Sequence, residues 1–585
     1  MQFVFHLACA DVLARRRTPR RVRRATPWPL LAGLLATLVA LPAAAAHAAA
    51  HAGAHHAPKH RAAAAHRLVR HNAPPEPAES DADEAAEQPH VSIPSPDGGL
   101  PAPVVAALNR AHIPISSISV VVERLGDRLP IVGWNAGQAM QPASTMKVVT
   151  TYGGLSILGP DFRWRTSAFA DGPVVNGELR GNLYIEGTGD PKLVPEQLID
   201  LVERIHAAGI MTVSGDLVLD KSYFAANTRD APPLDDDADA AYNVGPDPLL
   251  YAFNALTFSV SPSGGGRADV AVVPQLANLH IFNNVRVVRG ACRGVNVASP
   301  RIVEHPGGTL DAVFSGTLSS RCGTESANRA VLTHTQFFAG GFLQLWQQTG
   351  GSVRGAIREA QVPQSARLIA THLGPPLSDV VHDINKFSNN VMARNLFLTM
   401  GAIGGRPPSD IPESSEVINR WLTRIGVPMP ELVSDNGSGL SREARISAAS
   451  LASLLQSAMN SPVAQPFTDS LPTVGVDGTM RNRLRNAGIA GRARIKTGTL
   501  GNVRAIAGYV AAENGQTYVV VSFINDPRSE AGRAAHDELL NWVYELAAPP
   551  AVTRRGVVRP DLPSSPPATP ISPARPNSPL YPASR

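Results

Sequence analysis

The sequence of 585 residues has only three cysteines, six lysines and no apolar run long enough to cross a membrane comfortably. Three cysteines are too few for a small scaffold held together by several disulfides. There is no cysteine pair at zinc-finger spacing, no His-Glu-x-x-His sequence and no Gly-Lys-Ser/Thr phosphate loop. We therefore expect no metal and no cofactor. The length instead allows about two to four domains with sizeable cores.

The net charge of +5 comes from the two ends of the chain. Residues 1–46 carry a net +6 and residues 549–585 carry +4, which leaves −5 for residues 47–548. The body of the protein is thus mildly acidic, and we expect no binding to nucleic acid.

The first 46 residues have the order of an export signal. An arginine-rich stretch is followed by an apolar run over 28–41 and then by small residues after Pro42. A run of roughly 14 residues is short for a membrane span, which needs about 20. We expect 1–46 to be a cleaved signal peptide, and the mature protein to lie in the periplasm or cell envelope. An uncleaved N-terminal anchor is the alternative.

Two further segments have the composition of disordered chain. In residues 47–99, seven histidines lie among alanines over 47–71 and an acidic, proline-rich run follows. Such a composition cannot bury enough apolar surface to fold. The histidines could also bind a divalent metal, although they lack fixed zinc-ligand spacing. Residues 549–585 contain 11 prolines. We interpret them as a disordered tail, and their positive charge suits peripheral contact with an anionic wall or membrane.

Export also bears on the cysteines. Cys9 would leave with the signal peptide, so that Cys292 and Cys322 remain as an even pair in an oxidising compartment. We expect a disulfide between them, and two buried thiols are the alternative.

The scarcity of lysine directs attention to each one. Arginine keeps its proton in proteins, whereas a desolvated lysine can become a neutral base. Lys147 follows Ser144 by three residues in a Ser-x-x-Lys pattern directly after Pro142. A helix that starts at this proline would place both side chains on one face, so that the amine could take the proton of the serine.

Two other patterns suit the same chemistry. Lys496 opens Lys-Thr-Gly-Thr, with Thr497, Gly498 and Thr499, beside strand-like sequences over 503–510 and 518–523. A substrate carboxylate could lie along such a strand. The third pattern is the pair Ser388 and Asn390, which could face a cleft from the start of a helix. Taken alone, Ser388 is more typical of a helix N-cap.

In the order Ser-x-x-Lys, Ser-x-Asn, Lys-Thr-Gly, the three motifs are the signature of penicillin-recognising serine acyl enzymes. Ser388 lies 244 positions after Ser144, which is more than a compact β-lactamase needs. The chain resembles the D-alanyl-D-alanine carboxypeptidase/endopeptidase family, the class C low-molecular-mass penicillin-binding proteins. The resemblance extends to Gly-Thr-Gly-Asp-Pro at 187–191, Gly-Ser-Gly-Leu-Ser at 437–441 and Val-Asp-Gly-Thr at 476–479.

The resemblance implies an α/β (α+β) fold with a transpeptidase/β-lactamase-like domain, in which helices cover an antiparallel sheet. This catalytic domain would comprise 100–166 and 369–548. Two β-rich inserted domains would interrupt it, one over 167–255 and 335–368 and an inner one over 256–334. Strand-like patterns at 179–185 and 268–273 agree with β-rich inserts.

The resemblance also implies a role for each motif residue. Ser144 would be the acylating nucleophile and Lys147 its base, while Ser388 and Lys496 would return the proton to the leaving D-Ala. Asn390 would hold the substrate amide, and Thr497, Gly498 and Thr499 the terminal carboxylate. The expected ligands are peptidoglycan peptides and β-lactams.

The chain departs from the family pattern at two places. Asn436 stands behind Asp435 where the family usually has an Asp before Gly-Ser-Gly-Leu-Ser. The family's acidic loop looks replaced by Leu-Asp-Asp-Asp at 234–237, in which Asp237 would bind the amine end of the peptide. The alternative functions are a β-lactamase and a non-catalytic peptidoglycan-binding scaffold. A class A β-lactamase would need a deacylating glutamate, and none lies between Lys147 and the strand-like segment at 178.

Overall fold

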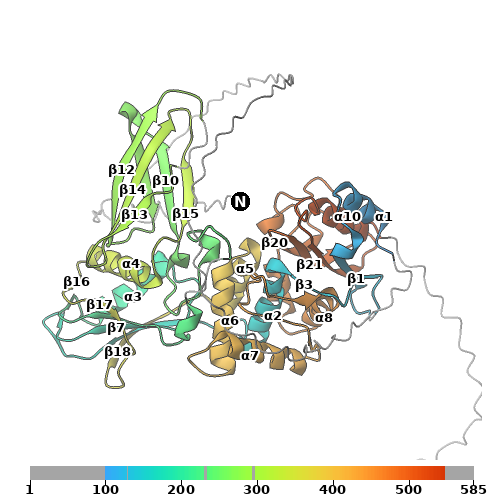
Figure 1. Cartoon of the computed structure of the whole chain (residues 1–585). Helices are drawn as coiled ribbons and strands as arrows, with labels where there is room; N and C mark the ends of the chain where they lie inside the picture. Colours follow the sequence, from blue (N-terminus) through green and yellow to red (C-terminus); the bar gives the residue numbers. More distant parts are fainter. Residues whose placement is uncertain (1–98, 128, 230–233, 293–296, 547–585) are drawn as a thin grey trace, which may run out of the picture. The chain divides into compact units, whose positions relative to one another are not determined.

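The computed structural model describes residues 99–127, 129–229, 234–292 and 297–546 (Figure 1). The expected signal peptide, the tail, Cys9 and nearly all of the linker lie outside the described residues. Among those residues, no helix has the length and apolar character needed to cross a membrane.

The central sheet of the first region has five strands in the order β2-β1-β22-β21-β20, and all its neighbours are antiparallel. It joins the two ends of the described chain, because Ile118 pairs with Ile524. The sequence favours these strands through runs of β-branched and aromatic residues. Their bounds are β1 (Ile118–Arg124), β2 (Val132–Trp134), β20 (Ala493–Leu500), β21 (Val503–Ala511) and β22 (Thr517–Asn525).

Helices cover both faces of this sheet, and the alternation of side chains along its strands shows how. On β22, Val519, Val521 and Phe523 belong to one core, whereas Val520 and Ile524 belong to the other. Because strand side chains alternate between faces, these cores lie on opposite sides of the sheet. The predicted antiparallel sheet covered by helices is therefore present.

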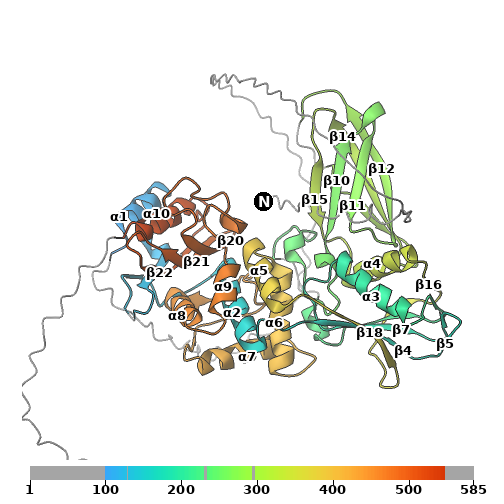
Figure 2. The same ribbon diagram turned by 180° about the vertical axis from the view of Figure 1, so that it is seen from behind.

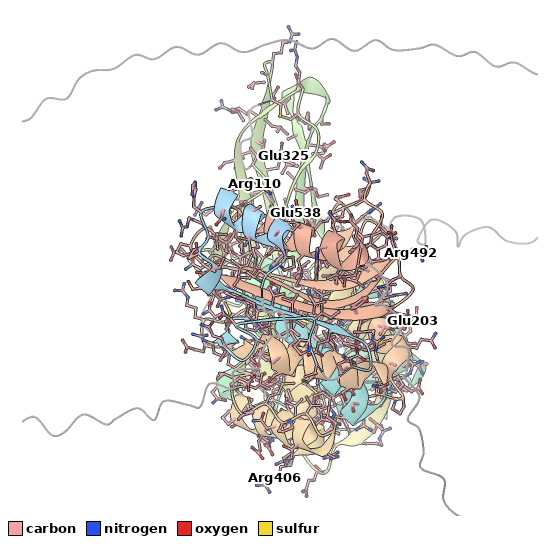
Figure 3. The ribbon with its side chains drawn as sticks, turned by 90° about the vertical axis from the view of Figure 1, so that its right-hand side faces the viewer. Arg110, Glu203, Glu325, Arg406, Arg492 and Glu538 are labelled. Carbon is pink, nitrogen blue, oxygen red and sulfur yellow. A yellow bond between two sulfur atoms is a disulfide. The ribbon has the colours of Figure 1, made fainter. Side chains whose placement is uncertain are left out.

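One core is closed by the two terminal helices. These are α1 (Ala102–Arg110) and α10 (Arg533–Tyr544), which lie side by side in Figure 3, with Arg110 and Glu538 labelled. The other core holds α2 (Met146–Leu158), α5 (Leu377–Phe387), α6 (Asn390–Gly404), α7 (Ile411–Arg424), α8 (Ala448–Met459) and α9 (Ala464–Ser470). The short strands β3 (Ala139–Met140) and β19 (Ile446–Ser447) pair beside them.

The inserted region contains a second five-stranded sheet and a small four-stranded one. The larger has the order β17-β9-β7-β4-β18 and the smaller β16-β8-β6-β5. Helices α3 (Pro195–Ala207) and α4 (His334–Gln348) lie on one side of the larger sheet (Figure 2). The strands are β4 (Arg165–Ala170), β5 (Val174–Val175), β6 (Glu178–Leu179), β7 (Leu183–Gly187), β8 (Thr212–Val213), β9 (Leu217–Asp220), β16 (Ser352–Val353), β17 (Ile357–Glu359) and β18 (Arg367–Leu373).

Two details refine the predicted segmentation. The expected domain limits at 166 and 369 fall inside β4 and β18, which pair with each other. The strand-like pattern at 179–185 is divided between β6 and β7, because Asn182 leaves the strand and donates to Asp171 through its backbone N–H at 2.6 Å and its side-chain amide at 2.7 Å.

The inner insert consists of two three-stranded sheets in the orders β11-β10-β15 and β12-β14-β13. Phe258 of one sheet contacts Phe314 of the other, with ring centroids 5.5 Å apart. Cys292 and Cys322, which we expected to pair, are joined by a disulfide. The strands are β10 (Leu256–Pro262), β11 (Ala268–Val273), β12 (Leu279–Val288), β13 (Arg301–Glu304), β14 (Leu310–Ser319) and β15 (Glu325–Arg329).

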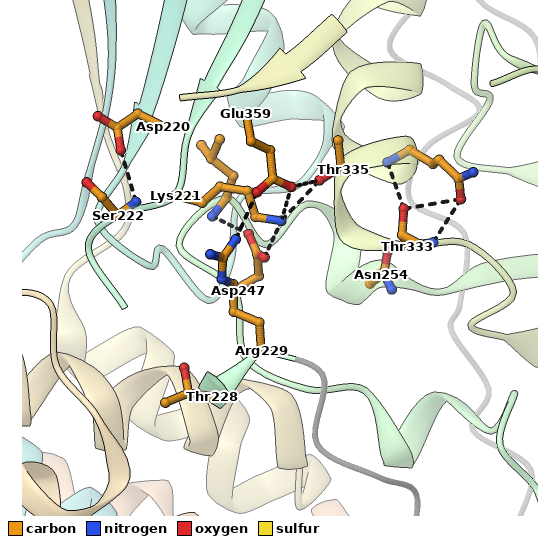
Figure 4. A network of polar contacts seen from close by, with 12 residues as sticks. Asp220, Lys221, Ser222, Thr228, Arg229, Asp247, Asn254, Thr333, Thr335 and Glu359 are labelled. Carbon is orange, nitrogen blue, oxygen red and sulfur yellow. Dashed lines mark hydrogen bonds and ion pairs between the residues drawn. The ribbon is translucent and has the colours of Figure 1, made fainter. Parts of the chain in front are cut away.

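A buried polar network ties the inserted region to helix α6. Lys221 Nζ lies 2.7 Å from Asp247 Oδ2 and 3.2 Å from Glu359, and Arg229 pairs with Glu359 at 3.1 Å (Figure 4). The backbone of Asp247 is held in turn by Asn395 of α6, whose amide donates to the Asp247 carbonyl at 3.0 Å. Helix α6 therefore takes its position from both regions.

Candidate active site

Ser144 lies on a tight turn that delivers it to the start of α2. The turn is a short 3-10 helix (Ala143–Thr145), and α2 follows at once, so that Lys147 stands one turn after Ser144 as the Ser-x-x-Lys spacing predicts. Ala143 has a φ of 47°, a strained conformation for a residue with a side chain. Strain of this kind is common beside reacting groups, and it must be held by the surroundings.

Two glycines allow the chain to pack closely around this turn. A Cβ on Gly439 would lie 1.9 Å from the Ala143 carbonyl oxygen, and a Cβ on Gly498 would lie 2.7 Å from the Pro142 carbonyl oxygen. Gly439 belongs to the Gly-Ser-Gly-Leu-Ser segment and Gly498 to Lys-Thr-Gly. Both segments therefore press against the backbone that carries Ser144.

The Lys147 amine is fully buried and has three acceptors. Nζ lies 3.0 Å from Ser144 Oγ, 2.7 Å from Asn390 Oδ1 and 2.7 Å from the Ser438 carbonyl. Burial lowers its pKa well below the ordinary value, and the charges of Lys496 and Arg394 lower it further. A neutral amine at this distance can accept the hydroxyl proton of Ser144.

Lys496 forms a second buried amine beside the second serine. Its Nζ donates to Ser388 Oγ at 2.8 Å and to the Thr497 carbonyl at 2.9 Å. Burial lowers the pKa of Lys496 to about 7. Ser388 and Lys496 are thus arranged so that a proton can pass between them.

The structure corrects one interpretation of Ser388. It is not a helix N-cap: it ends α5 in the left-handed conformation, with a φ of 55°. The cap of α6 is Asn389, whose side chain accepts from the Met392 N–H at 3.1 Å. Since the cap is supplied by its neighbour, the Ser388 hydroxyl is left to meet Lys496.

Asn390 is the first residue of α6, and both ends of its amide are engaged. Oδ1 accepts from Lys147, while Nδ2 donates to the Tyr242 carbonyl at 3.0 Å. The sequence predicted that this amide would donate to the substrate; in the structure the inserted region supplies its acceptor. The motif residues form two hydrogen-bonded groups, Lys147 with Ser144 and Asn390, and Lys496 with Ser388. The groups are close enough for the charge of Lys496 to lower the pKa of Lys147.

The remaining residues of the Lys-Thr-Gly motif lie on β20, an edge strand of the five-stranded sheet. Thr497 Oγ1 donates to Thr479 Oγ1 at 2.8 Å, and Thr499 is exposed. Asp477, two residues before Thr479, pairs through its carboxylate with the buried Lys386 at 2.7 Å. Because Lys386 lies two residues before Ser388, this ion pair links two of the three motifs.

Asp237 lies apart from the cluster. Its carboxylate pairs with Arg329 at 3.4 Å and is about half exposed. The acidic segment reaches the site instead through Asp235, which accepts from Tyr242 at 2.7 Å and from Asn243 at 2.9 Å. The hydrogen bond to Asp235 helps to raise the pKa of Tyr242 to about 12.

Several residues of the site escaped the sequence analysis. Tyr242 and Ser438 contribute backbone carbonyls, which leave no mark in the side-chain sequence. The signals for Ser438 and Thr479 were the Gly-Ser-Gly-Leu-Ser and Val-Asp-Gly-Thr segments, which we quoted only for their resemblance. Nothing in the sequence around Arg394 distinguished it from the many other arginines.

Comparison with known proteins shows which family has this sequence and fold. Residues 101–546 match the D-Ala-D-Ala carboxypeptidase 3 (S13) family. The chain belongs to this family. It is accordingly a serine-type D-Ala-D-Ala carboxypeptidase, as the three motifs predicted, and the predicted family and enzyme class are confirmed.

Individual relatives agree with the family. The enzyme is 30% identical over 453 residues to the D-alanyl-D-alanine carboxypeptidase of Actinomadura sp. (strain R39), covering 74% of this chain and 82% of the relative. It is 26% identical over 413 residues to the D-alanyl-D-alanine carboxypeptidase DacB of Haemophilus influenzae, covering 70% and 85%.

A solved structure supports the fold. Penicillin binding protein 4 from Haemophilus influenzae superimposes with a TM-score of 0.64 at 24% identity, covering 76% of this chain and 99% of that protein. A second structure of the same protein, complexed with a β-lactam, gives a TM-score of 0.60 at 24% identity, with the same coverage. The predicted fold class, a transpeptidase/β-lactamase-like domain with mixed helices and sheets, is confirmed.

Proposed function

We propose that the enzyme cleaves the terminal D-Ala-D-Ala bond of peptidoglycan stem peptides through an acyl-enzyme on Ser144. The observation that carries this assignment is the 3.0 Å contact between Ser144 Oγ and a fully buried Lys147 amine. Burial favours the neutral amine, which is the form that can act as a base.

Acylation begins when Ser144 Oγ attacks the carbonyl carbon of the penultimate D-Ala and passes its proton to Lys147. The backbone N–H groups of Ser144 and Thr499 would hold the oxyanion, and one such donor lowers the barrier by about 3–4 kcal/mol. When the C–N bond breaks, the leaving D-Ala nitrogen takes a proton from Ser388, which is replenished from Lys496. The product is an ester on Ser144 and free D-Ala.

Deacylation repeats these steps with water as the nucleophile. Before this step the proton that Lys147 took from Ser144 passes to the Ser388–Lys496 pair, which gave one up to the leaving D-Ala. The neutral Lys147 then takes a proton from the attacking water and returns it to the departing Ser144 oxygen. A β-lactam would acylate Ser144 in the same way. Opening of the four-membered ring keeps the cleaved amine attached to the acyl group, which blocks the path of the water.

The substrate backbone would lie along the edge strand β20. Added strands bind to such an edge through main-chain hydrogen bonds. Thr497 and Thr499 would bind the terminal carboxylate there. Gly498 has no side chain, so the substrate backbone can approach the strand closely. We retain Asp237 as a candidate for the amine end of the peptide. If it has this role, Asp237→Asn will raise KM for the peptide without changing the rate of acylation by penicillin; an unchanged KM removes Asp237 from the site.

The decisive experiment pairs covalent labelling with product analysis. We expect Ser144→Ala to abolish labelling by a fluorescent penicillin while the thermal melting curve stays that of the wild type. Persistent stoichiometric labelling would refute Ser144 as the nucleophile. Mass spectrometry of cell-wall fragments should show loss of one D-Ala from pentapeptides for a carboxypeptidase, and conversion of cross-linked dimers to monomers for an endopeptidase.

The same experiment separates the alternatives. A β-lactamase would hydrolyse nitrocefin rapidly in the steady state, and a scaffold would release no D-Ala. We expect a single burst of nitrocefin hydrolysis, equal to the enzyme present, followed by slow turnover.

The place of action follows from the substrate. Peptidoglycan lies outside the cytoplasmic membrane, so we propose that the enzyme is exported, with 1–46 as its signal. The basic segment 549–585 would add electrostatic contact with anionic wall or membrane. Binding to isolated walls should then weaken with salt and on deletion of 549–585. Binding that is unaffected by both changes would remove this role.

A further inference from the structure

Arg394 lies on the same face of α6 as Asn390, one helical turn further along, and it is buried with 7% exposure. Its Nη1 donates to the Asn243 carbonyl at 3.0 Å and to the Val244 carbonyl at 2.6 Å. Asn390 donates to the carbonyl of Tyr242, the residue immediately before. Two side chains of one helix thus hold three consecutive carbonyls of the inserted region.

The guanidinium forms no salt bridge with a carboxylate of the described residues. Its Nε is buried without a hydrogen-bond partner, and the charge of Asp435 opposes only in part the lowering of the Arg394 pKa by burial. Three other charged residues line the adjoining cavity together with Arg394, namely Asp435, Arg442 and Glu443. Asp435 is engaged by the hydroxyl of Ser441. Burying a cation without a salt bridge costs free energy, so a positive charge retained at this position calls for a reason.

The reason that we infer concerns the neighbouring amine of Lys147. Three neutral groups contact the Lys147 amine, namely Ser144, Asn390 and the Ser438 carbonyl. Two cations lower its pKa, Lys496 from β20 and Arg394, which stands one turn of α6 beyond Asn390. No carboxylate of the described residues lies within 4.0 Å of Lys147. Arg394, which stays protonated, and Lys496 whenever it is protonated therefore both disfavour a positive charge on Lys147.

We propose that Arg394 is a positioning residue that keeps the Lys147 amine uncharged and fixes the loop at 242–244 on which Asn390 rests. Arginine suits the electrostatic part because it stays protonated where a lysine would not: burial lowers the pKa of Arg394 only to about 10. This inference rests on the proposed role of Lys147 as the base.

The charge on Lys147 can be measured directly because the chain has only six lysines. We would label the full-length enzyme with 13C-lysine, follow the ε-carbon resonances with pH, and assign two of them with Lys147→Arg and Lys496→Arg. In Arg394→Met, the titration midpoint of Lys147 should rise by about one pH unit. The titration midpoint of Lys496 should rise by less than half as much, because the pKa of Lys496 is lowered by burial and not by Arg394.

Two further variants separate charge from packing. Arg394→Gln keeps an amide donor for the two carbonyls and loses the charge, so it should raise the Lys147 midpoint as Arg394→Met does, with a smaller rise in KM for the peptide. Arg420→Met on the exposed side of α7 removes a charge without touching the site and should leave both midpoints unchanged. Should Arg394→Met fail to fold, Arg394→Gln supplies the same electrostatic test.

Kinetics complete the test. Acylation by a fluorescent penicillin should be about tenfold slower in Arg394→Met on the acidic side of the profile and equal to wild type on the alkaline plateau. An unchanged Lys147 midpoint overturns the proposal, and so does an equal rise for Lys147 and Lys496, which would indicate general hydration of the site. A risen midpoint with an unmoved acylation profile would uphold the electrostatic effect and refute Lys147 as the base.

Discussion

Lys147 and Lys496 place two amines in the interior of one site, and their surroundings differ in ways that assign different work to them. Lys147 touches Ser144 and Asn390, with its pKa lowered by burial and by two nearby cations. Lys496 touches Ser388 and keeps a pKa of about 7. The first is the more easily neutral and suits the base, while the second can hold or release a proton near neutral pH.

The proposed role of Lys147 can be tested by a substitution that keeps the positive charge but cannot act as a base. Lys147→Arg should acylate with penicillin at less than a tenth of the wild-type rate, because a guanidinium does not accept the Ser144 proton. Stopped-flow labelling measures this rate, and Lys192→Arg, in a partly exposed ion pair with Asp383, serves as the control. A rate above one tenth would count against the amine as base.

Lys496 makes a prediction about stability and pH. Between pH 7 and 10.5 the unfolded chain holds the Lys496 proton and the folded chain does not, so this residue makes the protein more stable as the pH rises. Below pH 7 both states are protonated and the burial penalty is complete. Lys496→Met lacks the penalty, so its stability advantage should be largest below pH 7 and shrink by about 1.4 kcal/mol per pH unit above it.

Urea unfolding of wild type and Lys496→Met at pH 6, 7, 8 and 9 measures this difference. A constant difference over that range would mean that Lys496 titrates at its ordinary pKa in the folded protein.

At the scale of elements, the site depends on close contact between segments that are distant in sequence. The turn before α2 fits against the Gly-Ser-Gly-Leu-Ser segment and β20 only because glycines stand at the contact points. The ion pair of Lys386 and Asp477 joins the end of α5 to the loop beside β20 in the same manner. The positions of the catalytic side chains are therefore set by packing between elements.

Gly439→Ala tests this packing. Gly439 has a φ of 74°, and its new methyl group would meet the Ala143 carbonyl, so the substitution should cost at least about 2 kcal/mol of stability. Acylation by penicillin should fall at least tenfold because Ser144 moves with Ala143. Gly501→Ala is the matched control, since a Cβ there meets nothing within 4 Å. Equal melting temperatures and labelling rates for the two variants would contradict the packing argument.

At the scale of the whole molecule, the catalytic sheet and the inserted region make unequal contributions. The three motifs come from α2, the α5–α6 junction and β20, whereas the insert reaches the cluster through the carbonyls at 242–244. The disulfide lies in the inner insert, far from these groups along the chain. The disulfide should therefore stabilise the inner insert without affecting the rate of acylation at Ser144.

The double variant Cys292→Ser/Cys322→Ser measures that separation. A cross-link between residues 30 positions apart contributes about 3–4 kcal/mol in the chain-entropy model. The variant should lose that much stability and become sensitive to proteolysis within 256–334, while the rate of acylation by penicillin at 25 °C stays at the wild-type value. Loss of acylation in a protein that remains folded would show that the inner insert takes part in shaping the site.

The sequence by itself determined the chemistry, the fold class and the motif residues. Ser144 and Lys147 are one helical turn apart, so their proximity follows from local geometry. The nearly continuous apolar runs of β21 and β22 indicate strands that are buried on both faces. The disulfide partners followed from counting cysteines.

Only the tertiary structure decided what surrounds these residues. The contacts to the carbonyls of Tyr242 and Ser438 and the burial of Arg394 depend on residues as many as 291 positions apart in the chain. Backbone carbonyls have no side-chain signature, and one arginine among many looks like the rest until its burial is known. For that reason the sequence could single out Lys147 as the candidate base, whereas its lowered pKa is explained by the burial and the cations that folding brings to it.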